Sequence, residues 1–160
     1  MQDRDGFTAF YERYRGEVHA AVAVTVGDRH LATDAVDEAF VRAAERWGEV
    51  SRMDRPAGWV YRVAVNWATS WRRKLSRRPT RQTEQLDREH HDRLPDVDLH
   101  GELAGLTPHQ RKLLVLRYGL DMSIEESAKL LGIAEGTLKS RVHRARATLR
   151  NLREATDGHA

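Results

Sequence analysis

The stretch EGTLKSRVHRARATLR, residues 135–150, combines a basic composition with a regular apolar seam. The seam consists of Leu138, Val142, Ala145 and Leu149. An α-helix advances about 100° per residue, so the other seam side chains lie within roughly 40° of Leu138. The far side of the same helix carries small and basic residues. We therefore predict a helix that packs through one face and presents the other to a partner.

Two helix starts precede this stretch and place it in a larger motif. Thr107 and Gln110 form one capping box, and Ser123 and Glu126 form a second. The short helix after Ser123 is predicted to end at Gly132, directly before the basic helix. A short helix, a tight turn and a longer basic helix are typical of a DNA-binding helix-turn-helix. The alternative is a solvent-exposed basic helix that closes a bundle.

Helical periodicity extends through the rest of the chain, and no segment shows convincing strand alternation. Residues 76–98 contain two prolines, many charges and few aliphatic side chains, which indicates a flexible linker. We predict an all-α protein in which this linker joins two small helical domains, residues 1–75 and 99–155, the second a helix-turn-helix. The first domain is predicted to contain helices over residues 6–26, 31–47 and 57–75.

Composition and motifs exclude several kinds of site. The chain has no cysteine, which excludes disulfides and thiolate metal sites. His90 and His91 lack further ligands at a usable spacing, so we predict no metal site. There is no phosphate-binding glycine loop and no nucleophile motif, so we expect neither a cofactor nor an enzyme. No apolar run approaches ~20 residues and the start, MQDRDGF, lacks a secretory core, so we expect a cytoplasmic protein without membrane insertion.

The net charge of +3 conceals a strong segregation of charge along the chain. Residues 60–83 contain seven Lys and Arg residues and no acid, and residues 135–153 contain six against one acid. Two basic segments on an otherwise acidic chain indicate two contacts with a polyanion such as nucleic acid. The alternative is that both segments are solvated helix faces.

Aromatic residues recur through the helix predicted over residues 57–75. Trp59, Val63, Trp67 and Trp71 are spaced four residues apart. At this spacing they share one side of a helix, and we predict that the tryptophans belong to the core rather than to a base-stacking surface. Tyr61 lies on the opposite side and is therefore the better aromatic candidate for contact with DNA.

Residues 106–150, LTPHQRKLLVLRYGLDMSIEESAKLLGIAEGTLKSRVHRARATLR, resemble the C-terminal DNA-binding domain of bacterial RNA polymerase sigma factors. The segments GDRHLATDAVDEAFVRAAERW and AGWVYRVAVNWATSWRRK are similar to the first domain of the extracytoplasmic-function (ECF) group of that family. The resemblance covers most of the chain outside the linker and the tail. It implies a dissociable subunit that gives RNA polymerase its promoter specificity.

This resemblance implies two separate contacts with promoter DNA. The C-terminal domain would read the upstream, minus-thirty-five element as duplex, with bases contacted by Lys139, Ser140, His143 and Arg144 and phosphates by Thr137 and Arg141. The N-terminal domain would recognise and open the minus-ten element. Its candidate contacts are Met53, Asp54, Tyr61, Arg62, Asn66, Arg72 and Arg73.

The resemblance also implies that the helix over residues 31–47 binds core RNA polymerase, through the coiled coil of the largest subunit. The candidate residues are Asp34, Asp37, Glu38, Val41 and Arg42. The second-largest subunit and an anti-sigma factor are further expected partners. The alternative function is a stand-alone helix-turn-helix repressor or activator, which would bind paired half-sites as a dimer.

Two positions depart from the usual pattern of this family. Asp37 stands where many members have Gln, in the helix expected to bind polymerase. Ala134 replaces the Ser that usually caps the recognition helix, and losing such a cap typically costs ~1 kcal/mol. Glu135 in the first turn is expected to offset part of this cost through the helix dipole.

Overall fold

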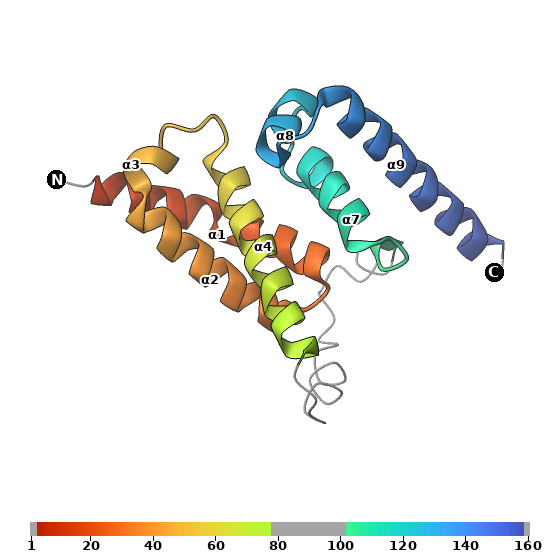
Figure 1. Ribbon diagram of the computed structural model, residues 1–160, viewed down its shortest axis with the longest axis horizontal. Coiled ribbons are helices and arrows are strands. Elements are labelled where there is room, and N and C mark those ends of the chain that lie inside the picture. The colour runs from red at the N-terminus through yellow and green to blue at the C-terminus, as the bar shows by residue number, and fades with distance from the viewer. Residues whose placement is uncertain (1–2, 78–101, 159–160) are drawn as a thin grey trace. The chain divides into compact units, whose positions relative to one another are not determined.

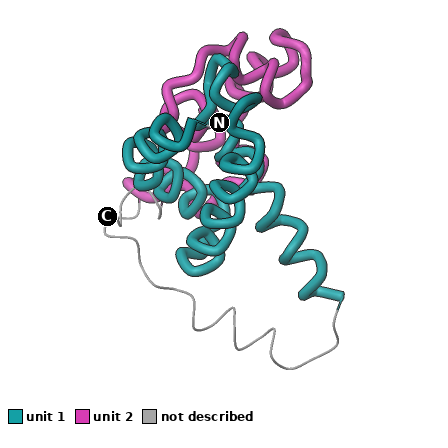
Figure 2. The backbone as a smooth tube through the Cα atoms, turned by 90° about the vertical axis from the view of Figure 1, so that its left-hand side faces the viewer, with its two compact units in different colours: residues 1–92 teal, residues 93–160 magenta. Residues whose placement is uncertain are grey.

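The computed structural model describes residues 3–77 and 102–158, and every regular element within those ranges is a helix (Figure 1). The chain divides into two compact units, residues 1–92 and 93–160 (Figure 2). The prediction of an all-α protein with two helical domains is therefore confirmed. Most of the predicted linker, including His90 and His91, lies outside the described residues.

The described part of unit 1 (residues 1–92), which runs from residue 3 to residue 77, contains three long helices and one short one. Gly27 ends the first helix with φ of 77°, a left-handed conformation that favours glycine. Asp28 then caps the second helix by accepting a hydrogen bond from the Leu31 N–H. With only these two residues between them, the first two helices pack side by side, and α4 packs on both. The helices are α1 (Arg4–Val26), α2 (Arg29–Glu45), α3 (Trp47–Val50) and α4 (Pro56–Ser76).

Small residues allow α2 to lie close to its neighbours. One face of α2 is buried and comprises Leu31, Ala35, Ala39 and Ala43. An aromatic cluster closes the end of the unit where α1 begins. There the Trp47 ring packs against Phe10 and Phe7, with centroid separations of 5.0 Å and 5.5 Å. Trp47 belongs to α3 because α2 ends at Glu45, two residues before the predicted end.

The buried face of α4 differs from the one predicted. Of the predicted core stripe, Trp59 is buried but Trp71 remains 44% exposed. Tyr61, which was expected to face DNA, is fully buried, and its hydroxyl lies 2.6 Å from Oγ1 of Thr25. The structure corrects that expectation, because a fully buried side chain offers no surface to DNA. The buried residues of α4 are Gly58, Trp59, Val60, Tyr61, Ala64, Val65 and Ala68.

Unit 2 (residues 93–160) contains the predicted helix-turn-helix. Both capping boxes form, one between Thr107 and Gln110 and the other between Ser123 and Glu126. Gly132 ends the short helix in the left-handed conformation, with φ of 67°. Among residues 102–158 of this unit, the helices are α7 (Pro108–Leu114), the π-helical segment η1 (Val115–Gly119), α8 (Ile124–Leu131) and α9 (Glu135–Asp157).

The apolar seam of α9 packs as predicted. Leu138, Val142 and Ala145 are buried against α7 and α8, whereas Leu149 is half-buried. The helix begins without a side-chain cap, because the methyl side chain of Ala134 cannot accept a hydrogen bond from the N–H groups of the first turn. One face of α9 is thus fixed in the unit while the other is left to solvent.

Candidate nucleic-acid and polymerase interfaces

The outward face of α9 carries all the residues predicted to contact the upstream DNA element. Because the buried seam fixes the rotation of the helix, these polar side chains must point away from unit 2. They are exposed without exception: Thr137, Lys139, Ser140, Arg141, His143 and Arg144. A helix of this length with small and basic outward residues can enter a major groove, where Lys and Arg pair with guanine or phosphate.

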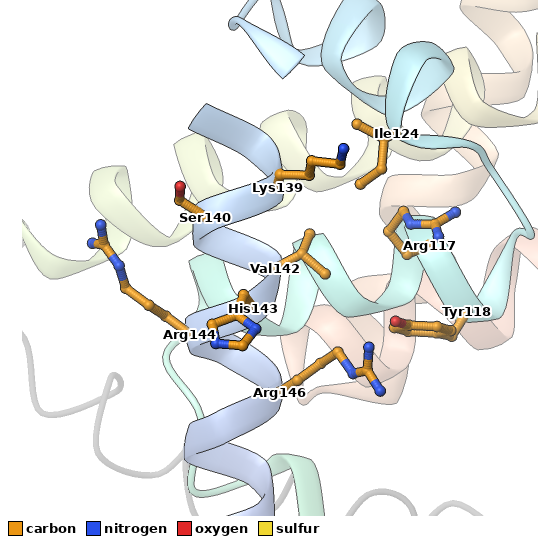
Figure 3. Close-up of a pocket in the computed structure, with 9 residues that line it drawn as sticks. All are labelled: Arg117, Tyr118, Ile124, Lys139, Ser140, Val142, His143, Arg144 and Arg146. Atoms are coloured by element: carbon orange, nitrogen blue, oxygen red, sulfur yellow. The ribbon is translucent and has the colours of Figure 1, made fainter. Parts of the chain in front are cut away.

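An open depression of about 620 Å³ lies beside this face (Figure 3). Two guanidinium groups lie near the Tyr118 ring there, with the Arg117 and Arg146 Cζ atoms 5.6 Å and 5.7 Å from its centroid. Such cation–π contacts hold positive charge next to an aromatic surface. The depression is lined by Arg117, Tyr118, Ile124, Lys139, Ser140, Val142, His143, Arg144 and Arg146. No acidic residue lines it, so it extends the cationic surface of α9.

Arg117 and Tyr118 were not among the residues predicted from the sequence to contact DNA. In a continuous α-helix, Tyr118 would lie about 40° from Leu114 and would share its buried side. The π-helical hydrogen bonding of η1 changes this register: Leu114 is buried, but Tyr118 is 52% exposed. A π-helical segment has no reliable sequence signal, so the pairing of Tyr118 with Arg146 could not be predicted.

The residues predicted to contact the minus-ten element occupy two places in unit 1. Asn66, Arg72 and Arg73 are exposed on α4, and Arg62 is half-buried there. Helical geometry places Arg62, Asn66 and Arg73 within roughly 40° of one another, whereas Arg72 lies about 100° from Arg73. The structure thus brings three of these residues together on one stripe of α4.

The loop between α3 and α4 holds the other two candidates. Met53 is 36% exposed and Asp54 is exposed, so both side chains are accessible. Val50 at the end of α3 is fully buried, and Pro56 starts α4, so both ends of the loop are held by the fold. An anchored loop with exposed side chains can act as a binding element.

The polymerase-binding candidates lie on the outward face of α2. Val41 is 54% exposed amid charged neighbours, which makes it an apolar contact point. Nε of Arg42 donates a hydrogen bond to Glu38 over 3.0 Å, and Arg15 of α1 lies 3.5 Å from Asp37. Because surface ion pairs contribute little stability, these carboxylates remain available to a partner. Asp34, Asp37 and Arg42 are exposed, and Glu38 is half-buried.

The described helices have no membrane-spanning candidate. None of those in residues 3–77 and 102–158 combines the length and the apolar character that a membrane span requires.

Comparison with known proteins identifies the family of this chain. Residues 10–78 match the family described as Sigma-70 region 2, and residues 96–149 match Sigma-70, region 4. The RNA polymerase sigma-E factor of Streptomyces avermitilis is 37% identical over 133 residues, covering 79% of this chain and 73% of that protein. The ECF RNA polymerase sigma factor SigM of Mycobacterium tuberculosis is 30% identical over 160 residues, covering 94% and 78%.

Solved structures show the same fold. The sigma factor RpoE of Bartonella quintana, crystallised with the anti-sigma factor NepR, superposes with a TM-score of 0.73 at 23% identity, covering 93% of this chain and 97% of that one. CnrH, solved with the cytosolic domain of CnrY, gives a TM-score of 0.67 at 25% identity, covering 96% and 91%. A stand-alone repressor or activator is not favoured, because the matches include region 2 as well as region 4. The chain belongs to the ECF group of bacterial RNA polymerase sigma factors, which direct promoter-specific initiation of transcription.

Proposed function

We propose that the two units of this sigma factor contact different parts of one promoter while α2 binds core RNA polymerase. The single observation that carries the proposal is the division of α9 into a buried apolar seam and an exposed polar face. The buried side includes Leu138 and Val142, and every upstream-element candidate lies on the exposed side. In this proposal the protein acts as a specificity subunit in the cytoplasm and is not itself an enzyme.

In unit 2, the proposed readers of the minus-thirty-five bases are Lys139, Ser140, His143 and Arg144. Their charged and hydrogen-bonding groups match the donors and acceptors at base edges in a major groove. Thr137 lies in the first turn of α9, where unpaired backbone N–H groups favour a phosphate. With Arg141 it would fix the register of the helix on the duplex.

In unit 1, the proposed minus-ten contacts are Met53, Asp54, Arg62, Asn66, Arg72 and Arg73. Tyr61 is excluded from this set because it is buried in the core. The exposed Asn66 can hydrogen-bond a base edge, and the adjacent Arg73 can neutralise phosphates. The anchored loop with Met53 would receive a base that has left the stack.

The α2 surface is the proposed docking site for core polymerase. Val41 provides an apolar contact, and the surrounding Asp34, Asp37 and Glu38 provide negative charge. Such a surface fits a basic helical partner, for which we propose the coiled coil of the largest subunit; the second-largest subunit is a further proposed contact. Because the similar sigma factor RpoE was solved with the anti-sigma factor NepR, we also propose an anti-sigma factor as a regulator of this chain.

Run-off transcription with purified core polymerase tests the proposed function. The full chain should cause initiation at a subset of a promoter library, and core polymerase alone should not. Tethering both DNA contacts to one polymerase raises their effective concentration, so the chain should bind promoters more tightly within the holoenzyme than alone. Tight operator binding by a dimer of the isolated chain, without core-dependent initiation, would contradict the proposal.

A further inference from the structure

Two tryptophans on α4 form a stacked pair at the surface of unit 1. The rings of Trp67 and Trp71 are 5.7 Å apart at their centroids, and their planes differ by only 5°. Trp67 is half-buried, whereas Trp71 leaves 44% of its surface exposed. The other two tryptophans of the chain, Trp47 and Trp59, are each only 7% exposed. The outer member of the pair is thus a large aromatic surface that the core does not use.

The part of α4 that carries this pair is cationic. Between residues 55 and 77 the chain has Arg and Lys residues but no Asp or Glu. Helical geometry places Lys74 about 20° from Trp67 and roughly 60° from Trp71 on the α4 wheel. Arg77 is also exposed and lies about 80° from Trp67 in the same direction as Lys74, so positive charge adjoins the aromatic pair along one side. A polyanion with flat aromatic groups is complementary to this combination.

We propose that Trp71, supported by Trp67, is a stacking site for an unpaired base of single-stranded nucleic acid. The base would lie on the exposed part of the Trp71 ring, while Lys74 and Arg77 neutralise the adjoining phosphates. Trp67 is a positioning residue, because its parallel ring limits the rotation of Trp71 and pre-orders the surface. None of the minus-ten residues above supplies a stacking contact of this kind. The stacking site rests on the proposed function in one respect only, which is that an opened promoter strand is taken as its natural ligand.

The stacking contact can be measured on the full chain without polymerase. Fluorescence anisotropy of a labelled single-stranded oligonucleotide, and of the matching duplex, gives both affinities at low ionic strength. Trp71→Ala should weaken single-strand binding about tenfold, within the range for one base–aromatic stack. It should leave duplex binding unchanged, because paired bases do not expose their faces. Trp71→Phe should restore most of the single-strand affinity.

A second variant tests the electrostatic part of the site. Lys74→Gln should reduce the slope of log affinity against log salt concentration for single-strand binding, because about one fewer counterion is released. The reduction should be the same for any base sequence. Far-UV circular dichroism and the thermal midpoint show whether each variant retains the fold.

Several results would overturn the stacking site. The first is that the unsubstituted chain shows no detectable binding to single strands. The second is that Trp71→Ala leaves the single-strand affinity unchanged, and the third is that Trp71→Ala lowers the affinities for single strand and duplex equally. If Trp71→Ala left the single-strand affinity unchanged, the Trp67–Trp71 pair would instead be a contact for another protein. Because core polymerase is absent from this assay, any of these results leaves core-dependent initiation untouched. Conversely, a chain that binds single strands but never initiates with core polymerase would contradict only the proposed function.

Discussion

The hydroxyl groups of Tyr61 and Thr25 lie 2.6 Å apart in the interior of unit 1 and join α4 to α1. Thr25 also donates its hydroxyl proton to the Ala21 carbonyl oxygen of its own helix, over 2.9 Å. The Tyr61 hydroxyl therefore donates to Thr25. This bond links the helix that carries the proposed minus-ten contacts to the rest of the unit, and it explains why the tyrosine is absent from the DNA surface.

A double-mutant cycle should detect the Tyr61–Thr25 bond. Tyr61→Phe and Thr25→Val should each lower the free energy of unfolding, and the coupling between them should be about 1 kcal/mol, since the pair makes one buried hydrogen bond. Chemical denaturation measures these values. Tyr61→Phe should also leave open-complex formation unchanged at a temperature where the variant is folded. Loss of promoter opening in a stable Tyr61→Phe variant would restore the tyrosine to the DNA contacts.

The missing cap of α9 predicts a stabilising substitution. Ala134 already has the extended backbone of a capping residue, with φ of −67° and ψ of 144°, but it makes no side-chain cap. Ala134→Ser should accept an N–H from the first turn and stabilise unit 2 by about 1 kcal/mol. Thermal unfolding should show a higher midpoint. Ala134→Gly is the matched control and should gain less; equal midpoints for Ser and Ala would refute the capping argument.

Charge reversal on α2 should separate polymerase binding from DNA binding. Glu38→Lys should weaken association with core polymerase by about tenfold, because it places a cation on the acidic docking surface. Glu12→Lys makes the same change at an exposed position of α1, outside that surface, and should have little effect. Surface-immobilised core polymerase and purified full-length variants provide the measurement. Similar losses for both variants would indicate a general charge effect instead of a docking site.

His19 predicts how the stability of unit 1 depends on pH. Burial, followed by the positive charges of Arg15 and Arg29, lowers the pKa of His19 below its ordinary value of 6.5. The backbone of Arg29 and the carboxylate of Asp37 oppose this shift, but the net direction is downward. The ring also lies 2.9 Å from the Thr33 hydroxyl, between α1 and α2.

The lowered pKa means that the unfolded chain binds a proton at His19 more readily than the folded chain. Stability from this residue is present above the unfolded pKa and declines as the pH falls through about 6.5 towards the lower folded pKa. Denaturant midpoints at pH 7.5 and 5.5 should therefore differ less for His19→Gln than for the unsubstituted chain. A larger difference in the variant would show that the sign is wrong.

Sequence periodicity was sufficient to predict the elements that pack through one regular apolar seam. The α9 seam around Leu138 and Val142, and the two capping boxes, follow local rules that the structure obeys. The face of α4 could not be predicted in the same way. The stripe with the tryptophans and the stripe that is buried overlap at Trp59, so periodicity alone does not distinguish them. In the structure α1 and α2 pack on the side of α4 that contains Tyr61, and Trp71 is left exposed.

The depression beside α9 could not be predicted, because it is formed in part by an irregular helix for which the sequence has no signal. Tyr118 reaches Arg146 only because η1 departs from α-helical register, and both belong to elements that were predicted as ordinary helices. The roles of the exposed residues in DNA and polymerase binding remain predictions, since exposure makes a contact available without selecting its partner.

The central claim is that the exposed face of α9 reads the upstream promoter element within a core-bound complex. Run-off transcription by the reconstituted holoenzyme, on templates with a randomised minus-thirty-five duplex, tests it most directly. Arg144→Ala should lose about tenfold or more of the preference among upstream sequences while it still binds core polymerase. Arg150→Ala, an exposed change on the same helix outside the proposed face, should keep that preference. Equal sequence preference in both variants, or equal loss of core binding and promoter use in Arg144→Ala, would contradict the account.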